Sequence, residues 1–388
     1  MISSHWDWIT MLIYLFLSVL GMWCLSNVKH VRGNNTYLNK FYYFLLVTVW
    51  TSFASFRLVT DDIGGTDSIS YIDFFENCNK NAYSVQMDHF ASDVLFKWIN
   101  QLIRYFTPDY HVFYIITYGM IVISIIKFFI AFCPYRTNYV PYVLSFYLFL
   151  RSINTFRSSL AISFLLIALT LFFKRKLIYS LLFCLAAVLT HKMMGLFILV
   201  IPFCKLIGNK QLDYKKIALL TILSYLVVSA LVPFFMMINS SVDLGNNYGY
   251  YVSSQEGQSF FDNFWKIAFE QLLLFFLLYK CDGGMCRFYS CDQYALKSYK
   301  TIKLICVFDF LTIPICFVMG IWRGAEVFYA PRIVMWGFIL YFLFREKKLM
   351  NIFAFFCFEL WIIFRVSRTW EADKYMPYVF EPLLYLIG

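Results

Sequence analysis

Charged residues are scarce in this sequence, and their scarcity excludes a soluble globular protein. Asp, Glu, Lys and Arg make up 14% of the 388 residues, whereas hydrophobic residues reach 61%. Soluble domains carry about 25% charged residues, so no soluble core would absorb this much apolar surface. Aromatic residues account for 22% of the chain, and a bilayer accepts them both as lipid-facing bulk and as interfacial belts. The composition therefore indicates an integral membrane protein.

The motifs of nucleotide-driven and metal-dependent enzymes are also missing. The absence of a G-x-x-x-x-G-K-[ST] or G-x-G-x-x-G loop excludes an ATP-driven pump, unless a partner supplies the ATPase. The absence of H-E-x-x-H leaves a metal hydrolase without support. Most cysteines lie in apolar stretches, and Cys281, Cys286 and Cys291 lie in a short polar segment that we interpret as a loop. These three lack the close C-x-x-C pairs typical of zinc sites, so we expect no metal and no other cofactor.

Long apolar stretches recur along the whole chain and predict transmembrane helices. A helical span needs about 20 apolar residues, and about twelve stretches qualify. They lie near residues 6–25, 41–59, 111–132, 141–153, 157–173, 177–191, 194–208, 217–238, 263–280, 301–321, 328–344 and 349–365. The first stretch has no basic segment before it and no small-residue cleavage site, so we expect it to be retained. No repeat or linker divides the sequence, which predicts a single integral domain over residues 1–388, an all-α polytopic transmembrane bundle.

Basic residues are concentrated in alternate connections between these stretches. One set of loops carries clusters such as those at residues 174–176, 215–216 and 345–348. The opposite loops are longer and acidic. Because cytoplasmic loops are enriched in Lys and Arg, the first set is predicted to be cytoplasmic and both termini extracytoplasmic. The net charge of +10 thus reflects membrane topology, and we expect no nucleic-acid partner.

Two of the predicted outer segments are long. In residues 60–110, the stretch ASDVLFKWINQLIRYF has apolar residues at helical spacing, which predicts an amphipathic helix lying in the outer membrane interface. Residues 239–262 are rich in Asn, Ser, Gly and Tyr. This composition suits either a loop that covers a carbohydrate site or an inert linker.

Several arginines are predicted to lie at the outer ends of spans. They are Arg57, Arg151, Arg157, Arg323 and Arg332, followed by Arg365 and Arg368 after the last span. Placing an arginine within a span costs roughly 2.5–3.5 kcal/mol, so such arginines are functional candidates. Guanidinium groups present paired donors that match phosphate, and a cavity lined by them suits a multiply charged anion. The alternative is that each arginine only extends its head group to the interface.

Other ionisable residues also fall in or beside the predicted spans. His191 ends the sixth stretch on the predicted outer side, where a histidine can act as a general base or donate a hydrogen bond to sugar or phosphate. The alternative is a helix-end histidine bonded to a neighbouring carbonyl. Glu270, Asp309 and Glu359 lie within spans, and we expect them to form structural ion pairs with arginines.

Short motifs that follow one another along the chain carry a family resemblance. In order, they are Arg57 with the loop G-T-D-S-I-S-Y (Gly65 to Tyr71), S-D-V-L-F-K-W (from Ser92), F-R-S-S-L-A-I (Arg157), L-T-H-K-M-M-G (His191), R-x-x-x-x-x-Y (Arg323 to Tyr329) and Y-M-P-Y (Tyr375 to Tyr378). Together they resemble the Wzy/EpsG-type polysaccharide polymerases of bacterial cell-surface biosynthesis. The chain departs from that pattern at Ser158, Lys192 and Asp93, where the family more often has Gln, a small polar residue and Glu.

The resemblance implies a glycosyltransferase in the bacterial inner membrane, with a GT-C-like fold. Donor and acceptor would both be undecaprenyl-pyrophosphate-linked oligosaccharides in the outer leaflet, and a chain-length regulator is a further candidate partner. The residues expected to be catalytic are His191, Asp67 and Arg157. The residues expected to bind substrate are Arg57, Arg151, Arg323, Arg332, Tyr71, Asp93 and Tyr329.

Two other classes compete with this interpretation. A flippase or exporter of lipid-linked sugars would use the same arginines, but internal repeats and midplane charges are expected of it. A membrane O-acyltransferase of surface glycans would need an acyl donor reached from the cytoplasm, and the inner loops here are short and basic.

Overall fold

The computed structural model describes residues 5–27, 37–60, 64–65, 67–79, 93–133, 140–208, 212–241, 268–318, 326–344, 353, 356–357, 360 and 379–382. Within these ranges the chain is helical, and the β-type pairing is an isolated antiparallel bridge between Arg57 and Phe380. The predicted all-α fold is confirmed for this part of the chain.

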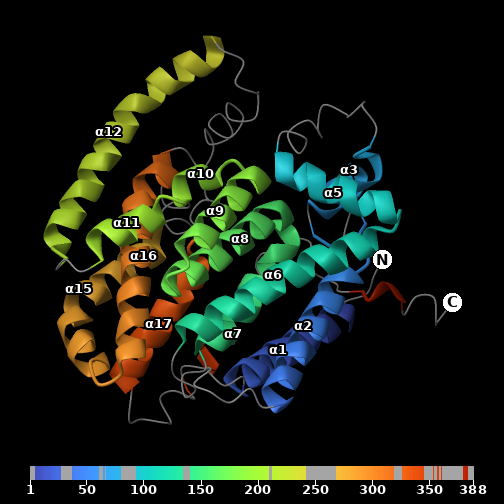
Figure 1. Cartoon of the computed structure of the whole chain (residues 1–388), viewed down its shortest axis with the longest axis horizontal. Helices are drawn as coiled ribbons and strands as arrows, with labels where there is room; N and C mark the ends of the chain where they lie inside the picture. Colours follow the sequence, from blue (N-terminus) through green and yellow to red (C-terminus); the bar gives the residue numbers. More distant parts are fainter. Residues whose placement is uncertain are drawn as a thin grey trace. The chain divides into compact units, whose positions relative to one another are not determined.

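The helices group into two compact units. The first comprises Met1–Ile198 and Leu343–Gly388, and the second comprises Leu199–Phe342. The first unit contains α1 (His5–Asn27), α2 (Tyr37–Ser55), α3 (Ser68–Asn77), α5 (Val94–Phe106), α6 (Tyr110–Phe132), α7 (Val140–Asn154), α8 (Phe156–Phe173), α9 (Leu177–Thr190) and α10 (Met194–Phe197) (Figure 1). The second unit contains α11 (Val200–Ile207), α12 (Tyr214–Ser241), α15 (Phe269–Tyr289), α16 (Gln293–Val318) and most of α17 (Tyr329–Phe344).

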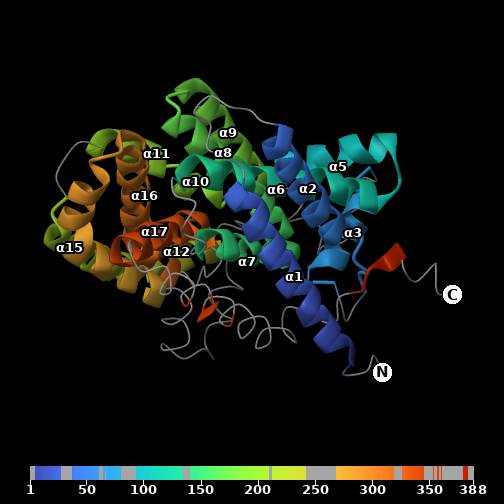
Figure 2. The same ribbon diagram turned by 90° about the horizontal axis from the view of Figure 1, so that it is seen from below.

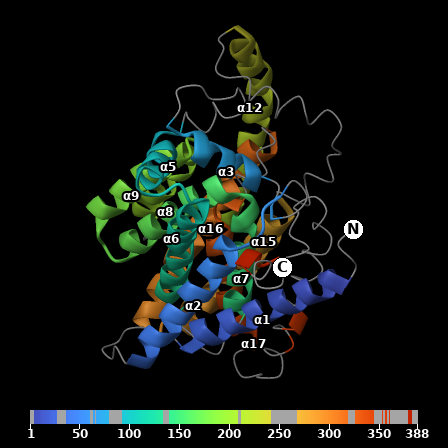
Figure 3. The same cartoon turned by 90° about the vertical axis from the view of Figure 1, so that its right-hand side faces the viewer.

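Helix α6 forms the centre of the first unit. It packs against α2 and α8 along its length and also contacts α3, α5 and α7. Its buried residues, such as Phe113, Ile126 and Phe129, occur on several sides of the helix, as expected for a helix surrounded by others. Figure 3 shows α3 and α5 together beyond one end of the α6 helix. The elements that carry the polar motifs therefore gather at that end of the unit.

Three of the described helical segments are long and apolar enough to cross a membrane. They are Ile9–Asn27, Tyr110–Phe132 and Phe156–Phe173. Leu177–Thr190, Met194–Ile207 and Tyr329–Phe344 are shorter apolar segments. The prediction of a membrane protein with apolar helices is confirmed, and the larger number of spans stays a prediction.

A tight basic turn joins α8 to α9 and makes the two helices antiparallel neighbours. Arg175 has a positive φ of 61°, while the amides of Arg175 and Lys176 donate to the carbonyls of Phe172 and Leu171 at 2.9 Å each. This is the hydrogen-bond pattern of a Schellman helix end. At about 1.5 Å per residue, α8 separates this turn from Arg157, in its first turn, by roughly 27 Å. The start of α8 and the end of α9 consequently lie at the same end of the unit, opposite the basic turn.

Helix α16 has a similar central position in the second unit. It packs against α11, α12 and α15, and Figure 2 shows α11, α15 and α16 side by side. The Tyr289 hydroxyl on α15 donates to the carbonyl oxygen of Phe338 on α17 at 2.6 Å. Lys303 on α16 forms an ion pair with Asp282 on α15 at 2.9 Å. These contacts link three helices of this unit.

Three predictions about local structure were wrong or incomplete. The stretch 194–208 is interrupted at residues 198–199 and forms two short helices, α10 and α11. The segment with Cys281 and Cys286 is helical up to Tyr289 instead of a loop, because Asp282 within it is neutralised by Lys303 of the neighbouring helix. Helix α3 was not predicted, since its short apolar face was read together with the surrounding polar loop.

Some predicted features lie outside the described residues. They include most of the span at 349–365, nearly all of the 239–262 segment, and the residues Thr66, Arg323, Glu359, Arg365, Arg368 and Tyr375 to Tyr378.

Candidate functional site

Asp93, Arg157 and His191, which lie far apart in the sequence, meet in the first unit. The Nη1 atom of Arg157 lies 2.9 Å from Oδ2 of Asp93, and Nδ1 of His191 lies 3.4 Å from the same oxygen. The other carboxylate oxygen, Oδ1, accepts a hydrogen bond of 3.2 Å from the amide of Lys192. We call these three side chains the Asp93 cluster. All three were singled out in the sequence, Arg157 and His191 as catalytic and Asp93 as substrate-binding.

Each member of the Asp93 cluster comes from the end of a different helix. Asp93 is the N-cap residue of α5, yet its side chain does not cap that helix. Arg157 is in the first turn of α8, and His191 is the C-cap residue of α9. An aspartate at this position usually accepts a hydrogen bond from its own helix. Here the carboxylate is directed at groups from α8 and the end of α9, so it joins three elements at one point.

The cluster combines a buried carboxylate with a guanidinium and an imidazole that are less buried. The side chain of Asp93 is 2% exposed, whereas Arg157 and His191 keep 12% and 15% of their side-chain surface exposed. A buried carboxylate requires a charged or hydrogen-bonding partner, and it has both. When His191 carries a proton, the three groups together have a net positive charge. Such a group of side chains can bind an anion and can also accept or donate a proton.

Arg57 forms a second polar centre at the end of α2. Its guanidinium is buried and donates to the carbonyl of Gly64 at 2.8 Å, to Oγ of Ser68 at 3.0 Å and to the Tyr118 hydroxyl at 3.2 Å. It also donates to the Ala54 carbonyl. These contacts hold the turn before α3, where Gly64 and Gly65 have φ of +93° and +105°, a region that glycine adopts without strain.

The remaining candidates of the first unit are Asp67, which was predicted to be catalytic, and Tyr71 and Arg151, which were predicted to bind substrate. Asp67 is the N-cap residue of α3, and Tyr71, on the same helix, is buried against the rings of Phe96 and Phe156. Arg151 lies in the last turn of α7 and donates to the Tyr147 hydroxyl at 3.3 Å. Tyr71 is thus part of the aromatic core beneath the site, while the roles of Asp67 and Arg151 stay predictions.

Arg332, in the second unit, pairs with two acidic residues. Its Nη1 atom lies 2.7 Å from Oε2 of Glu270, and its Nε atom lies 3.1 Å from Oδ2 of Asp309. The indole of Trp336 donates to the other oxygen of Glu270 at 3.2 Å. The ion pairing expected for Glu270 and Asp309 is confirmed. The ring of Tyr329 lies 5.3 Å from the guanidinium carbon of Arg332, so these two substrate-binding candidates are neighbours.

Sequence reasoning did not identify several residues that complete these centres. The hydroxyl of Tyr118, the side chain of Ser68 and the ring of Tyr114, 4.9 Å from the Arg57 guanidinium, all contact Arg57. Near the same end of α2, Glu381 accepts a hydrogen bond of 3.0 Å from Tyr110 and lies 3.3 Å from Nε2 of His111. Ser68 lies within the G-T-D-S-I-S-Y motif but was not singled out in it, and tyrosine is so common in this chain that nothing distinguished Tyr114 and Tyr118 from their neighbours.

Acidic, histidine and cysteine side chains are the residues that could hold a metal ion. Within the described ranges, no group of three or more His, Cys, Asp or Glu side chains is placed to hold a metal ion. The Asp93 cluster itself offers a carboxylate, a guanidinium and an imidazole.

Together, the apolar helices and the charged centres at their ends place the chain in the class of helical membrane proteins. The family model of the EpsG family matches residues 40–380. The chain belongs to the EpsG family, as the resemblance predicted. Comparisons with curated proteins and with solved structures give no match.

Proposed function

We propose that the protein is a polysaccharide repeat-unit polymerase, a glycosyltransferase that joins undecaprenyl-pyrophosphate-linked oligosaccharides at the outer leaflet of the bacterial inner membrane. The observation that carries the proposal is the Asp93 cluster, in which a guanidinium and an imidazole share one buried carboxylate. Membership of the EpsG family supports it independently.

The reaction requires one bond to form and one to break. The acceptor hydroxyl, on the non-reducing end of one lipid-linked unit, attacks the anomeric carbon of the growing chain. The bond between that carbon and the pyrophosphate oxygen breaks, and the lipid pyrophosphate leaves with the electron pair. The proton of the acceptor hydroxyl passes to a base. Negative charge therefore increases on the leaving group, and a positive group placed there lowers the barrier.

The members of the cluster can divide these tasks. Arg157 presents paired donors toward the pyrophosphate. His191, whose Nδ1 faces Asp93, would accept the proton through Nε2, and the Asp93 carboxylate stabilises the imidazolium that forms. Asp67 at the start of α3 is the alternative base. Arg57 and Arg151 would contribute to the positive potential around the donor.

We propose about twelve spans in a GT-C-like arrangement, with both termini outside. The basic turn at residues 174–176 and the Asp93 cluster lie at opposite ends of α8 and α9, which is the arrangement that the positive-inside rule requires if the cluster faces outward. Helix α5, with exposed Trp98, Leu102 and Phe106, would lie in the outer interface.

A reconstituted reaction tests the proposed function. Purified protein supplied only with lipid-linked repeat units, without nucleotide and with a chelator, is expected to form a ladder of longer glycans on a gel. A mixture that never advances beyond one repeat unit, while intact units cross the bilayer of a sealed vesicle, would replace the polymerase with a transporter.

Cysteine labelling tests the orientation. In a variant without the native cysteines, single cysteines at residues 174–176 or 345–348 should be shielded from an impermeant thiol reagent in intact cells. Cysteines at Ser240 or Gln255 should be labelled. The expectation rests on the basic character of the first two segments. The reverse pattern would contradict the topology and the outward-facing site.

Replacing Arg157 with lysine tests whether paired donors are needed. Arg157→Lys keeps the charge but loses the planar fork, so we expect at least tenfold slower glycan transfer. Arg104→Lys is the matched control, because Arg104 donates to the backbone carbonyl of Pro108 at the surface and should transfer glycan at the normal rate. Equal activity of both variants, at equal amounts in the membrane, would show that Arg157 is structural.

A further inference from the structure

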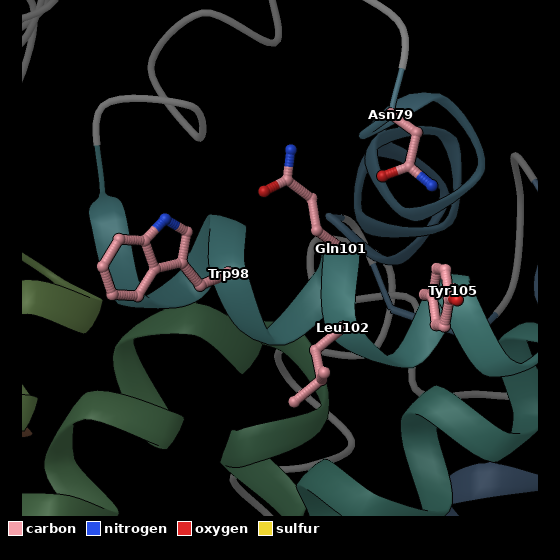
Figure 4. A pocket seen from close by; sticks show the side chains of 5 residues that line it. All are labelled: Asn79, Trp98, Gln101, Leu102 and Tyr105. Carbon is pink, nitrogen blue, oxygen red and sulfur yellow. The ribbon is translucent and has the colours of Figure 1, made fainter.

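An open groove of about 720 Å³ lies on the exposed face of α5, beside the end of α3. It is lined by Asn79, Trp98, Gln101, Leu102 and Tyr105. Figure 4 shows Gln101 between Trp98 on one side and Asn79 and Tyr105 on the other. These lining side chains comprise two aromatic rings, two carboxamides and one leucine, with no charge among them. The groove is thus chemically different from the Asp93 cluster.

The chemistry of the lining matches a neutral sugar. A sugar ring has an apolar face of C–H groups and a rim of hydroxyls, so it is bound by an aromatic surface together with a few fixed polar groups. Trp98 and Tyr105 are 63% and 81% exposed, and they supply the surface. Each carboxamide offers both donors and acceptors to hydroxyls. A phosphate would instead need the cationic groups found at the cluster.

The groove is also held in shape. The side-chain nitrogen of Gln101 donates to the carbonyl oxygen of Cys78, at the end of α3, at 3.0 Å. This bond ties α5 to α3 and fixes the carboxamide between the two rings. Trp98 and Tyr105 are separated by seven positions, or two turns, so they project on the same side of α5 about 10 Å apart along its axis. This length gives the groove the form of a strip along the helix.

The exposed surface of α5 has two parallel stripes of different chemistry. Leu95, Ile99, Leu102 and Phe106 form an apolar stripe that suits lipid; Leu95 and Ile99 are partly buried, and Leu102 also borders the groove. Val94, Trp98, Gln101 and Tyr105 form the adjacent stripe, which faces Asn79 across the groove. A lipid-facing surface gains nothing from the carboxamide of Gln101 or from that of Asn79 opposite it, whereas a sugar-binding surface needs such groups. The polar character of the second stripe therefore favours glycan over lipid as its occupant.

The position of the groove relates it to the Asp93 cluster. Asp93 directly precedes α5, and Trp98 follows it by five residues, or about 8 Å along the helix axis. We propose that the groove binds neutral sugar residues of the lipid-linked glycan while its pyrophosphate end lies at the Asp93 cluster. The inference rests on the proposed polymerase function and adds to it a glycan-binding subsite.

Binding of sugar alone is the first test. The probe is a set of oligosaccharides released from the surface polysaccharide of the producing cells, free of lipid and phosphate. Their addition should change the tryptophan fluorescence of the wild type and leave that of Trp98→Phe unchanged. Tyr105→Ala should bind about tenfold more weakly, and Phe106→Ala, with a similarly exposed ring on the apolar stripe, should bind normally. Identical titrations of the wild type and Trp98→Phe would overturn the proposal.

The polymer ladder is the second test and separates the two proposals. Tyr105→Ala should give shorter products than Phe106→Ala, because the growing chain is released sooner. If the wild type forms a ladder and both variants give products of the same length, the groove does not bind the glycan, but the proposed polymerase function is supported. If sugar binding depends on Trp98 but no ladder forms, the polymerase function is contradicted and the sugar-binding groove is supported. An equal loss of sugar binding in Tyr105→Ala and Phe106→Ala would show that the polar stripe is not a distinct sugar site and would overturn the proposal.

Discussion

Asp93→Asn is expected to lower the rate of glycan transfer by roughly 10²- to 10⁴-fold. Asparagine keeps the size of the side chain and can still accept from the amide of Lys192. It removes the charge that pairs with Arg157 at 2.9 Å and faces His191 at 3.4 Å. Without that charge, neither the orientation of the imidazole nor its protonated form is supported. The rate is measured as the appearance of the first two-unit product.

Asp109→Ala is the matched control for this variant. Asp109 is also an N-cap residue, but its carboxylate accepts from the amide of His111 at 2.8 Å and so caps its own helix. Its loss should cost about 1 kcal/mol of stability and leave the transfer rate within a few-fold of the wild type. Transfer by Asp93→Asn at the rate of this control would assign Asp93 a purely structural role.

His191→Ala should also reduce transfer by about 10²- to 10⁴-fold, the usual effect of removing a general base. Binding of the lipid-linked donor should be largely retained, because Arg157 and its ion pair with Asp93 remain. Cells with this variant should therefore accumulate single repeat units, still lipid-linked, on the outer face of the membrane. The two quantities to measure are the transfer rate and the affinity of the purified protein for the donor.

The outcome of this experiment separates the candidate bases. If His191→Ala transfers glycan at the normal rate and Asp67→Asn does not, the base is Asp67 at the start of α3. A loss of donor affinity as large as the loss of rate would show that His191 binds the donor and does not take the proton. His191→Gln, which keeps a hydrogen-bonding group near Asp93, distinguishes a positional role from proton transfer.

The fold could be predicted where apolar periodicity decides the structure. The stretches 111–132, 157–173 and 177–191 correspond to α6, α8 and α9 within one residue, because continuous apolar sequence bounded by polar breaks leaves little choice. Helix α3 was not predicted, because it is short and follows two glycines. The helical structure at the end of α15 was not predicted, because the charge of Asp282 is neutralised there by Lys303, which belongs to another helix.

The candidate site could be predicted residue by residue, but its pairing could not. The cost of intramembrane charge singled out Arg157 and Arg332. The position of His191 at the end of an apolar stretch singled out that residue, and the family resemblance singled out Asp93. That Asp93 contacts both Arg157 and His191 depends on α8 and α9 being antiparallel and on α5 packing beside α9, which are tertiary facts. The partners of Arg57 could not be predicted either, because its hydrogen bonds to Gly64, Ser68 and Tyr118 depend on the tertiary structure.

The pairing of the end of α2 with the far end of the chain sets an order for biosynthesis. Leu58 donates to the carbonyl of Val379 at 2.8 Å, and Glu381 donates to that of Phe56 at 2.9 Å. The second unit, Leu199–Phe342, is continuous in sequence and lies between these partners. Units fold as the ribosome delivers them, so the second unit can assemble while the first still waits for its final strand-like segment. Arrest of translation before residue 379 would leave the end of α2 without these backbone partners, although the whole second unit had already been synthesised.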